Sequence, residues 1–206
     1  GIGDFGVNGN ELLETPNIDA MAAKSGSLST FYVSPVCSPT RASLMTGRYN
    51  QRTRCIDTWL GRSMMDTDEY TVAEALQKSG YRTGLFGKWH LGDEHEYQPD
   101  QRGFNEVFIH GAGGIGQAYK CSCADAPNNN YFDPIIKHNN TFVKTEGFCT
   151  DVFFTQAMSW IQDKSKQDQP FFAYITTNAP HGPFLAPESY KKKFKEKGYS
   201  EKAQGF

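Results

Sequence analysis

The apolar runs of this 206-residue chain have the length of β-strands, and helix signals alternate with them. The longest run, residues 171–175, is far shorter than the roughly 20 apolar residues that a membrane-spanning helix needs. Fifteen Phe, ten Tyr and three Trp supply large apolar surface that a disordered chain lacks. The sequence therefore predicts an α/β layer structure around a substantial core, with no membrane span.

Local signals place the helices and strands along the chain. A threonine followed by a proline at 15–16 predicts a capped helix that ends near Gly26. Thr71 and Glu74 match a capping box, which predicts a helix that ends at Gly80. The other expected elements are strands over 29–33, 82–86 and 171–177, helices over 39–46 and 151–163, and a solvated basic helix or tail over 191–197.

Two stretches of this pattern bear on where a ligand would bind. Residues 105–147 are rich in Gly and Asn, which predicts a long surface excursion. The aromatic residues in it that are candidates for the wall of a substrate site are Tyr119, Tyr131 and Phe132. The strand expected over 171–177 is buried and leads into an Asn-Ala-Pro-His turn, and ligands of open α/β sheets bind at such carboxyl ends.

The charges of the chain nearly cancel, since 21 basic residues face 23 acidic ones and the net charge is −2. This balance gives no reason to expect charge-driven binding to nucleic acid. The five cysteines are an odd number and too sparse for a disulfide-stapled domain. Cys121 and Cys123 are too close together for a Cys-x-x-Cys redox or zinc site, and the four cysteines outside residue 37 leave one or two disulfides open.

The segment Cys-Ser-Pro-Thr-Arg at 37–41 carries the strongest chemical signal. Cys37 lies at the start of the helix expected over 39–46, where backbone N–H groups and the helix dipole favour an anion. Arg41, one turn later, adds a permanently charged donor that can bind two oxygens. These residue types fit an oxyanion site, and they fit at least as well a buried structural cysteine beside a surface arginine.

Three separated motifs favour the oxyanion site over the structural cysteine. Residues 37–48, Gly-Lys-Trp-His-Leu-Gly at 87–92 and Ala-Pro-His-Gly-Pro at 179–183 together resemble the type I, formylglycine-dependent sulfatase family, in particular its arylsulfatases. The resemblance extends over nearly the whole chain, including Thr-Pro-Asn-Ile-Asp at 15–19. It implies a three-layer α/β fold of the alkaline-phosphatase-like type. Residues 1–206 would then be a single partial catalytic domain, the N-terminal part of that fold, truncated at both ends.

The resemblance also implies an activity, the hydrolysis of a sulfuric ester, and a role for each motif residue. Cys37 would be oxidised to formylglycine by a formylglycine-generating maturation enzyme, and the hydrated aldehyde would be the nucleophile. Arg41 would support the modified residue, and Lys88 would neutralise the charge of the sulfate or of the nucleophile. His90 would hold or deprotonate a hydroxyl of the hydrate, and His181 would contact the sulfate or protonate the leaving oxygen.

A divalent cation, normally calcium, completes the machinery that the resemblance implies. Of its ligands only the modified Cys37 lies in this chain, because the family's paired aspartates would precede Gly1 and its second ligand pair would follow Phe206. Asp4 matches a family aspartate that is not a ligand. We therefore expect the 206 residues alone to bind calcium poorly, to lack turnover and to expose strand edges that lower solubility.

Several questions stay open at the level of the sequence. The substrate would be a sulfated small molecule or carbohydrate. Rival functions are a phosphonate or phosphodiester hydrolase of the same superfamily and a non-catalytic protein that binds sulfated glycans. Because sulfatases are usually exported, an extracytoplasmic location, periplasmic, secreted or lysosomal, is expected. No motif supports a role for the remaining histidines, His95, His110 and His138.

Overall fold

The structure of the protein is a computed structural model that describes residues 2–59 and 61–206. Contacts between residues divide the chain into two compact units, Gly1–Val33 and Ser34–Phe206. The single catalytic domain over 1–206 that the sequence predicts stays a prediction.

The first unit contains two short 3-10 helices and one α-helix: η1 (Ile2–Asp4), η2 (Gly6–Asn8) and α1 (Pro16–Ala22). α1 begins where the sequence predicts, with Pro16 in its first turn, but it ends before Gly26. The predicted cap is wrong, because Thr15 Oγ1 donates to Asp19 Oδ1 at 2.9 Å and accepts from the backbone N–H of Gly6 at 2.8 Å. The threonine therefore joins α1 to η2 instead of capping the helix.

The strand predicted over 29–33 is also wrong. These residues have no regular structure, and Phe31, Tyr32 and Val33 are exposed. A strand requires a neighbour that takes up its backbone hydrogen bonds, and within the described residues no strand pairs with this stretch.

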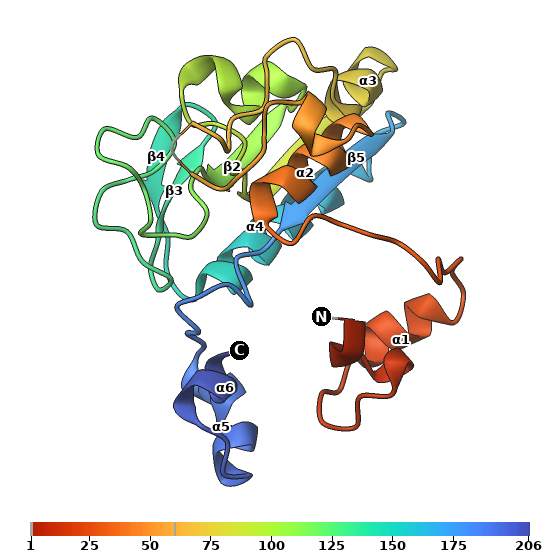
Figure 1. Cartoon of the computed structure of the whole chain (residues 1–206), viewed down its shortest axis with the longest axis vertical. Helices are drawn as coiled ribbons and strands as arrows, with labels where there is room; N and C mark the ends of the chain where they lie inside the picture. Colours follow the sequence, from red (N-terminus) through yellow and green to blue (C-terminus); the bar gives the residue numbers. More distant parts are fainter. Residues whose placement is uncertain (1, 60) are drawn as a thin grey trace. The chain divides into compact units, whose positions relative to one another are not determined.

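The second unit is built on a five-stranded sheet (Figure 1). Its strands are β1 (Arg82–Lys88), β2 (Glu106–His110), β3 (Ile135–His138), β4 (Thr141–Lys144) and β5 (Phe171–Thr176). They lie in the order β4-β3-β2-β1-β5, with β1 parallel to β2 and β5 and the other pairs antiparallel. Lys88 pairs with His110, and Gly87 pairs with Thr176, so the carboxyl ends of the three parallel strands meet at one edge.

Helices cover both faces of this sheet and make three layers (Figure 1). α2 (Cys37–Thr46) and α3 (Val72–Lys78) pack on one face, where Met45, Ala73 and Leu85 belong to one buried cluster. α4 (Cys149–Lys164) packs on the other face, where Phe86 and Phe153 belong to a second cluster. Because successive strand residues point to opposite faces, Leu85 and Phe86 enter different clusters. The three-layer α/β fold is confirmed.

The shorter helices of this unit are η3 (Asn50–Arg52), η4 (His95–Tyr97), η5 (Pro99–Arg102), α5 (Glu188–Glu196) and α6 (Glu201–Gly205). The capping box at the start of α3 is confirmed, because Thr71 and Glu74 each accept a hydrogen bond from the other's backbone N–H. In the part of the chain that the structure describes, no helix has the length and apolar character that crossing a bilayer requires.

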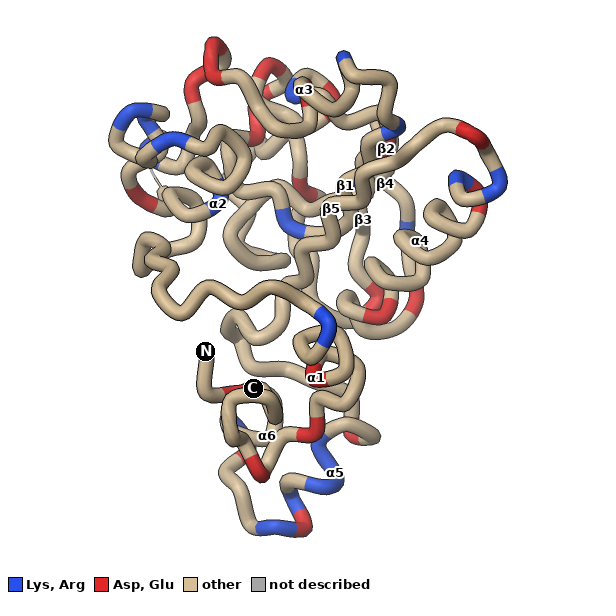
Figure 2. The backbone as a smooth tube through the Cα atoms, turned by 90° about the vertical axis from the view of Figure 1, so that its right-hand side faces the viewer, with Lys and Arg blue, Asp and Glu red and all other residues tan. Residues whose placement is uncertain are grey.

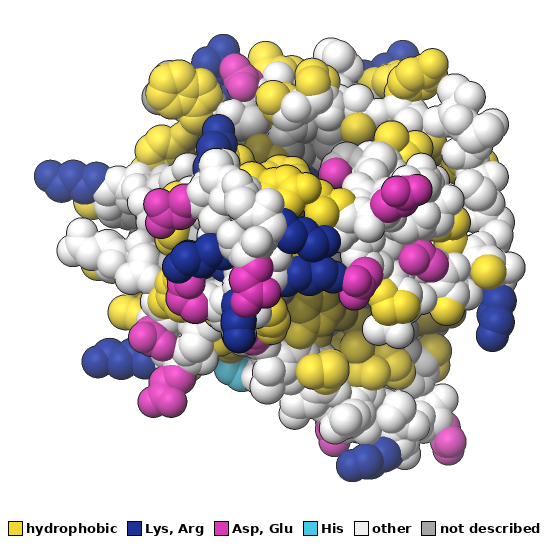
Figure 3. All heavy atoms as spheres, turned by 90° about the horizontal axis from the view of Figure 1, so that it is seen from below, with side chains coloured by type: hydrophobic (Ala, Val, Ile, Leu, Met, Phe, Trp, Pro, Cys, Tyr) yellow, Lys and Arg dark blue, Asp and Glu magenta, His cyan; other side chains and the backbone are white. Residues whose placement is uncertain are grey.

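The predicted basic segment forms α5, which carries the densest run of Lys and Arg in Figure 2. Elsewhere both basic and acidic residues are distributed along the chain. Figure 3 shows basic side chains interspersed with acidic ones.

Residues 105–147 are not the surface excursion that the sequence predicts. They contain β2, β3 and β4, and the side chains of Val107, Ile109 and Ile136 are buried. The stretch between β2 and β3 has no helix and only an isolated bridge, at Phe132. Four-residue strands such as β3 and β4 are too short to show an alternation of apolar and polar side chains. The tight turn between them, with Asn139 at a φ of 51°, has the composition of a loop.

β5 forms where a buried strand is predicted, but all six of its residues are half-buried. Among the described residues it pairs only with β1 and so lies at an edge of the sheet. The open strand edge that the resemblance implies is present, and the low solubility expected from it stays a prediction.

Candidate active site

The five side chains singled out by the motifs gather at the carboxyl edge of the parallel strands. Cys37 begins α2, Lys88 ends β1, and His90 and His181 follow β1 and β5. Cys37, His90 and His181 line one cavity of about 470 Å³. Lys88 and Arg41 are close enough to Cys37 for its charge to act on the pKa of both.

Cys37 is the first residue of α2 and is half-buried at the cavity wall. The helix starts here because Val36 is extended and because Pro39 fits the first turn, where its missing N–H costs no hydrogen bond. It ends at Gly47, whose positive φ of 68° lets its N–H reach Ser43 O at 2.8 Å. The placement of Cys37 at a helix N-terminus, where the dipole favours negative charge, is confirmed.

His90 is 8% exposed and lies between Cys37 and a backbone carbonyl. Its Nε2 is 2.8 Å from Thr58 O, and since a carbonyl only accepts, Nε2 carries the proton. The bare Nδ1 lies 3.3 Å from Cys37 Sγ. Burial and the charge of Lys88 lower the pKa of His90 to about 3, so the ring is neutral at pH 7. A Cβ at Gly113 would lie 2.8 Å from the ring, so any larger residue there would displace its surroundings.

Lys88 is 5% exposed, and its side chain lies close enough to Cys37 for the two to interact electrostatically. Burial lowers the pKa of Lys88, while attraction to Cys37 opposes that shift. Arg41 donates from Nε to Trp89 O at 2.9 Å and from Nη2 to Lys88 O. Thr176 Oγ1 donates to the same Lys88 carbonyl at 2.7 Å. Arg41 therefore ties α2 to the end of β1 and fixes Lys88 relative to Cys37.

His181 lies in the turn that follows β5. Its backbone N–H donates to Asn178 O at 2.8 Å, which closes the turn. Its Nδ1 lies 2.7 Å from Gly182 O, so Nδ1 carries the proton. Nε2 is then the ring nitrogen left for a ligand in the cavity.

Motifs do not mark every residue that shapes the site. The carbonyl of Thr58 holds His90, yet a backbone acceptor leaves no signal in residue type. The carboxylate of Asp125 accepts the backbone N–H groups of residues 111–112 at 3.0 and 2.7 Å and so holds the turn after β2. Burial raises the pKa of Asp125 to about 6. The glycine-rich run at 111–116 is the one sequence signal that this turn lies close to neighbouring residues such as His90.

The other histidines are placed away from the cavity wall. His110 is buried and pairs with Lys88 on the neighbouring strand, and neither ring nitrogen has a hydrogen-bond partner among the described residues. Burial lowers the pKa of His110 well below its usual value. His95 lies in η4, and His138 Nε2 contacts a carboxylate oxygen of Glu106 at 2.6 Å.

Of the three aromatic residues predicted to form a substrate-site wall, only Tyr119 lines this cavity. Tyr131 is buried, and its carbonyl accepts the N–H of Cys149 at 2.8 Å. Phe132 packs against Phe148, with ring centroids 5.4 Å apart. These two candidates pack against the body of the protein instead, because their segment folds back onto the start of α4.

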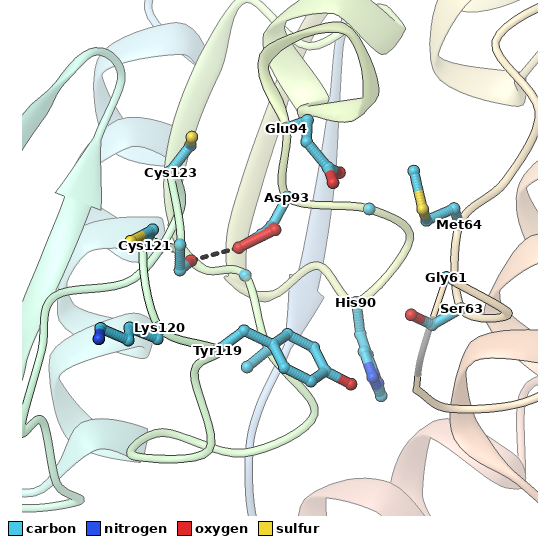
Figure 4. Close-up of a pocket in the computed structure, with 14 residues that line it drawn as sticks. Gly61, Ser63, Met64, His90, Asp93, Glu94, Tyr119, Lys120, Cys121 and Cys123 are labelled. Atoms are coloured by element: carbon cyan, nitrogen blue, oxygen red, sulfur yellow. Dashed lines mark hydrogen bonds between the residues drawn. The ribbon is translucent and has the colours of Figure 1, made fainter.

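A second cavity, of about 300 Å³, adjoins the first, since His90, Ala112 and Tyr119 line both. Figure 4 shows the phenol of Tyr119 directed toward His90. Two cysteines, Cys121 and Cys123, also reach this second cavity. All five cysteines of the chain are free thiols, so the disulfides that the sequence leaves open are not formed.

Within residues 2–59 and 61–206, no group of three or more His, Cys, Asp or Glu side chains is placed to hold a metal ion. The residues described therefore do not by themselves fit the calcium ion that the resemblance implies.

The fold and the site define an α/β protein with a thiol, two imidazoles and an ammonium group at the carboxyl edge of its sheet. The family described as Sulfatase matches residues 1–204, and the chain belongs to this family.

Individual relatives agree with this assignment. An arylsulfatase of Klebsiella aerogenes is 32% identical over 216 residues, covering 98% of this chain and 46% of the relative. An N-acetylgalactosamine-6-sulfatase of Mus musculus is 31% identical over 205 residues, covering 92% of this chain and 39% of the relative. The crystal structure of Ps i-CgsB in complex with k-i-k-neocarrahexaose is 30% identical, with a TM-score of 0.83, over 100% of this chain and 49% of that one.

The chain thus spans less than half the length of these relatives. The predicted fold class, part of an alkaline-phosphatase-like sulfatase domain, is confirmed. Neither the fold nor these similarities bear on the extracytoplasmic location, which stays a prediction.

Proposed function

We propose that the protein hydrolyses sulfuric esters, with residue 37 as the nucleophile after its cysteine is converted to formylglycine. One observation carries the proposal: Cys37 Sγ lies 3.3 Å from Nδ1 of His90, at the wall of a cavity that His181 also lines. A nucleophile beside an unprotonated imidazole nitrogen is the arrangement that covalent ester cleavage needs.

The surroundings of Cys37 fit an aldehyde at this position. The side chain is half-buried, lines the cavity and forms no disulfide. As a hydrated aldehyde, residue 37 would supply an oxygen that attacks the sulfate sulfur and displaces the alcohol, and a second hydroxyl that allows sulfate to be released. The chain's other residues would then bind the ester, move protons and neutralise charge.

His90 accepts the proton that the nucleophile gives up. Its Nε2–H is held by Thr58 O, so Nδ1 is the accepting nitrogen and faces residue 37. A pKa near 3 keeps Nδ1 free, and the negative charge of a bound sulfate ester raises that pKa and makes the ring a stronger base.

Lys88 supplies the positive charge at the nucleophile. Its buried ammonium neutralises the charge that develops on residue 37 or on a sulfate oxygen, in surroundings where water screens little. Arg41 acts through the backbone: it binds the carbonyls of Lys88 and Trp89 and keeps the end of β1 against α2. It is a positioning residue in this arrangement.

His181 serves the leaving group. Because its Nδ1–H is bound to Gly182 O, Nε2 is the nitrogen that meets the ester oxygen. In its protonated form the ring gives the Nε2 proton to the departing alcohol, which matters most when that alcohol is a poor leaving group.

We propose a sulfated carbohydrate as the substrate class. Trp59 and Tyr119 line the cavity, and they are 53% and 51% exposed, so their ring faces are accessible to a sugar ring. The relative Ps i-CgsB was crystallised with neocarrahexaose, a carbohydrate.

The calcium ion that the resemblance implies has no ligand set among the described residues, and the roles of the side chains above involve no metal. Elemental analysis of the full-length protein, purified without chelator, tests for a bound calcium ion.

The mass of tryptic peptide 25–41 tests the proposed nucleophile. The full-length protein is made beside a formylglycine-generating enzyme, and an aldehyde at residue 37 is expected. The same digest of a Cys37→Ala protein is the matched control. Unmodified cysteine, with the maturation enzyme active on a known sulfatase, would contradict the proposal. Release of sulfate from sulfated oligosaccharides then tests the substrate class.

A further inference from the structure

One buried hydroxyl reaches the turn that carries His181. Tyr131, between β2 and β3, is 2% exposed and lines neither of the two cavities. Its Oη donates to Gly182 O at 3.0 Å, and His181 O lies 3.4 Å from the same hydroxyl. A tyrosine remote in sequence therefore touches the backbone on both sides of the peptide bond that follows His181.

The carbonyl of Gly182 has two hydrogen-bond donors. It accepts the phenol of Tyr131 at 3.0 Å and Nδ1–H of His181 at 2.7 Å. A carbonyl oxygen has two lone pairs, so both bonds form at once. The phenol thus fixes the acceptor that decides which nitrogen of His181 carries the proton.

Tyr131 is itself held by the rigid part of the fold. Its ring belongs to the buried cluster that includes Phe148 and Phe153, and its carbonyl accepts the N–H of Cys149 at the start of α4. Burial raises the pKa of Tyr131 to about 12, so its hydroxyl keeps its proton and stays a donor at neutral pH.

The turn has weaker support of its own. The backbone hydrogen bond from His181 N–H to Asn178 O is local to the turn. The hydroxyl of Tyr131 reaches it from fifty residues away and links it to the core.

We propose that Tyr131 is a positioning residue for the reaction: through Gly182 O it orients the His181 ring and keeps the proton on Nδ1, so that Nε2 meets the substrate. The proposal rests on the proposed function, in which His181 serves the leaving group. A phenylalanine at 131 would keep the buried ring and remove only this link.

Nitrogen-15 NMR of the histidine side chains of the full-length protein tests the link without any need for activity. His181 is assigned by the loss of its signals in His181→Gln. We expect the Nδ1–H tautomer in the wild-type protein and a mixture of tautomers in Tyr131→Phe. Tyr190→Phe is the matched control, because it removes a phenol bond to Asp151, at 3.0 Å, outside the site.

Two results would overturn the proposal: an Nε2–H tautomer in the wild-type protein, or an unchanged His181 spectrum in Tyr131→Phe. The wild-type measurement decides even if the variant folds poorly. A wild-type protein that folds but releases no sulfate would refute the proposed function, while the NMR result would still decide the link.

Kinetics then separates positioning from general stability. For a sulfated sugar, Tyr131→Phe is expected to lower kcat about tenfold while KM changes by less than about twofold. In a His181→Ala background the same substitution is expected to have no further effect on kcat. Equal losses in both backgrounds would show that the hydroxyl only stabilises the fold and would overturn the proposal.

Discussion

The two sides of the cavity are held by different kinds of structure. Cys37, Lys88 and His90 lie at the ends of α2 and β1, where regular backbone hydrogen bonds and the guanidinium of Arg41 fix them. His181 lies in an irregular turn after β5.

This difference separates the two halves of the proposed reaction. On the nucleophile side many hydrogen bonds share the task of placing three groups, so the geometry exists before the substrate binds. On the leaving-group side the position of one ring depends on a few hydrogen bonds to a single carbonyl. Substitutions on the first side should therefore affect every substrate equally, whereas those on the second should depend on the leaving group.

Removal of the nucleophile should have the largest effect. In the mature full-length protein, Cys37→Ala is expected to lower kcat at least about a thousandfold for every sulfate ester, because residue 37 can no longer attack sulfur. Cys121→Ala, which removes an exposed free thiol, should keep the wild-type rate. A Cys37→Ala rate within about tenfold of the wild-type rate in a sulfate-release assay would disprove the assignment of residue 37.

The two histidines should differ in their dependence on the leaving group. His90→Ala is expected to lower kcat by about 10²–10⁴ for both a sulfated sugar and 4-nitrophenyl sulfate, because the nucleophile needs its base in both cases. His181→Ala should lower kcat about a hundredfold for the sugar ester and much less for the nitrophenyl ester, whose leaving group needs no proton.

His95→Ala, in η4, is the control for a lost histidine. The same pattern of losses across the two substrates for both histidines would remove the distinction between the two sides of the cavity.

A smaller effect should come from crowding His90. In Gly113→Ala the added Cβ would lie 2.8 Å from the ring, so the imidazole or the backbone of residue 113 must shift and the position of His90 relative to residue 37 changes. A displacement of a few tenths of an ångström to one ångström is expected to lower kcat by about tenfold to a hundredfold. Gly26→Ala adds the same methyl group where no heavy atom lies within 4 Å and should change nothing. Comparable rates for the two variants would argue against a tightly fixed His90.

The smallest effect should appear in stability and its dependence on pH. Burial holds the pKa of His110 well below its unfolded value near 6.5, so the folded state binds fewer protons than the unfolded one below that pH. Stability is therefore lost as the pH falls below about 6.5. His110→Leu removes the titrating group together with its two unpartnered ring nitrogens. The variant should therefore unfold at an equal or higher urea concentration than the wild-type protein at pH 7.5. It should also lose less stability when the pH is lowered to 5.

Urea unfolding of the wild-type and His110→Leu proteins at both pH values checks this. If the stability against urea differs more between pH 5 and pH 7.5 in the variant than in the wild-type protein, groups other than His110 cause the acid dependence.

Some parts of the site were predictable because short local patterns specify them. The residues at 37–41 mark a helix start, and the apolar run at 171–175 marks a strand whose end leads to His181. The segment at 111–134 was not predictable in this way. Asp125 binds residues 111–112 and Tyr131 binds Gly182, and contacts over such separations leave no periodic pattern.

The strand predicted over 29–33 failed for the same reason. Aromatic and β-branched side chains favour a strand, but only a neighbouring strand can pair with its backbone, and that neighbour is not encoded in the five residues themselves.

The sequence by itself determined the layer structure, the family and the identity of the five side chains at the edge of the sheet. Only the tertiary structure decided where their protons are. Thr58 O places the proton of His90 on Nε2, and Gly182 O places that of His181 on Nδ1. The physical reason is that both acceptors are backbone carbonyls, which every residue type carries, so their effect depends on position in space and not on sequence.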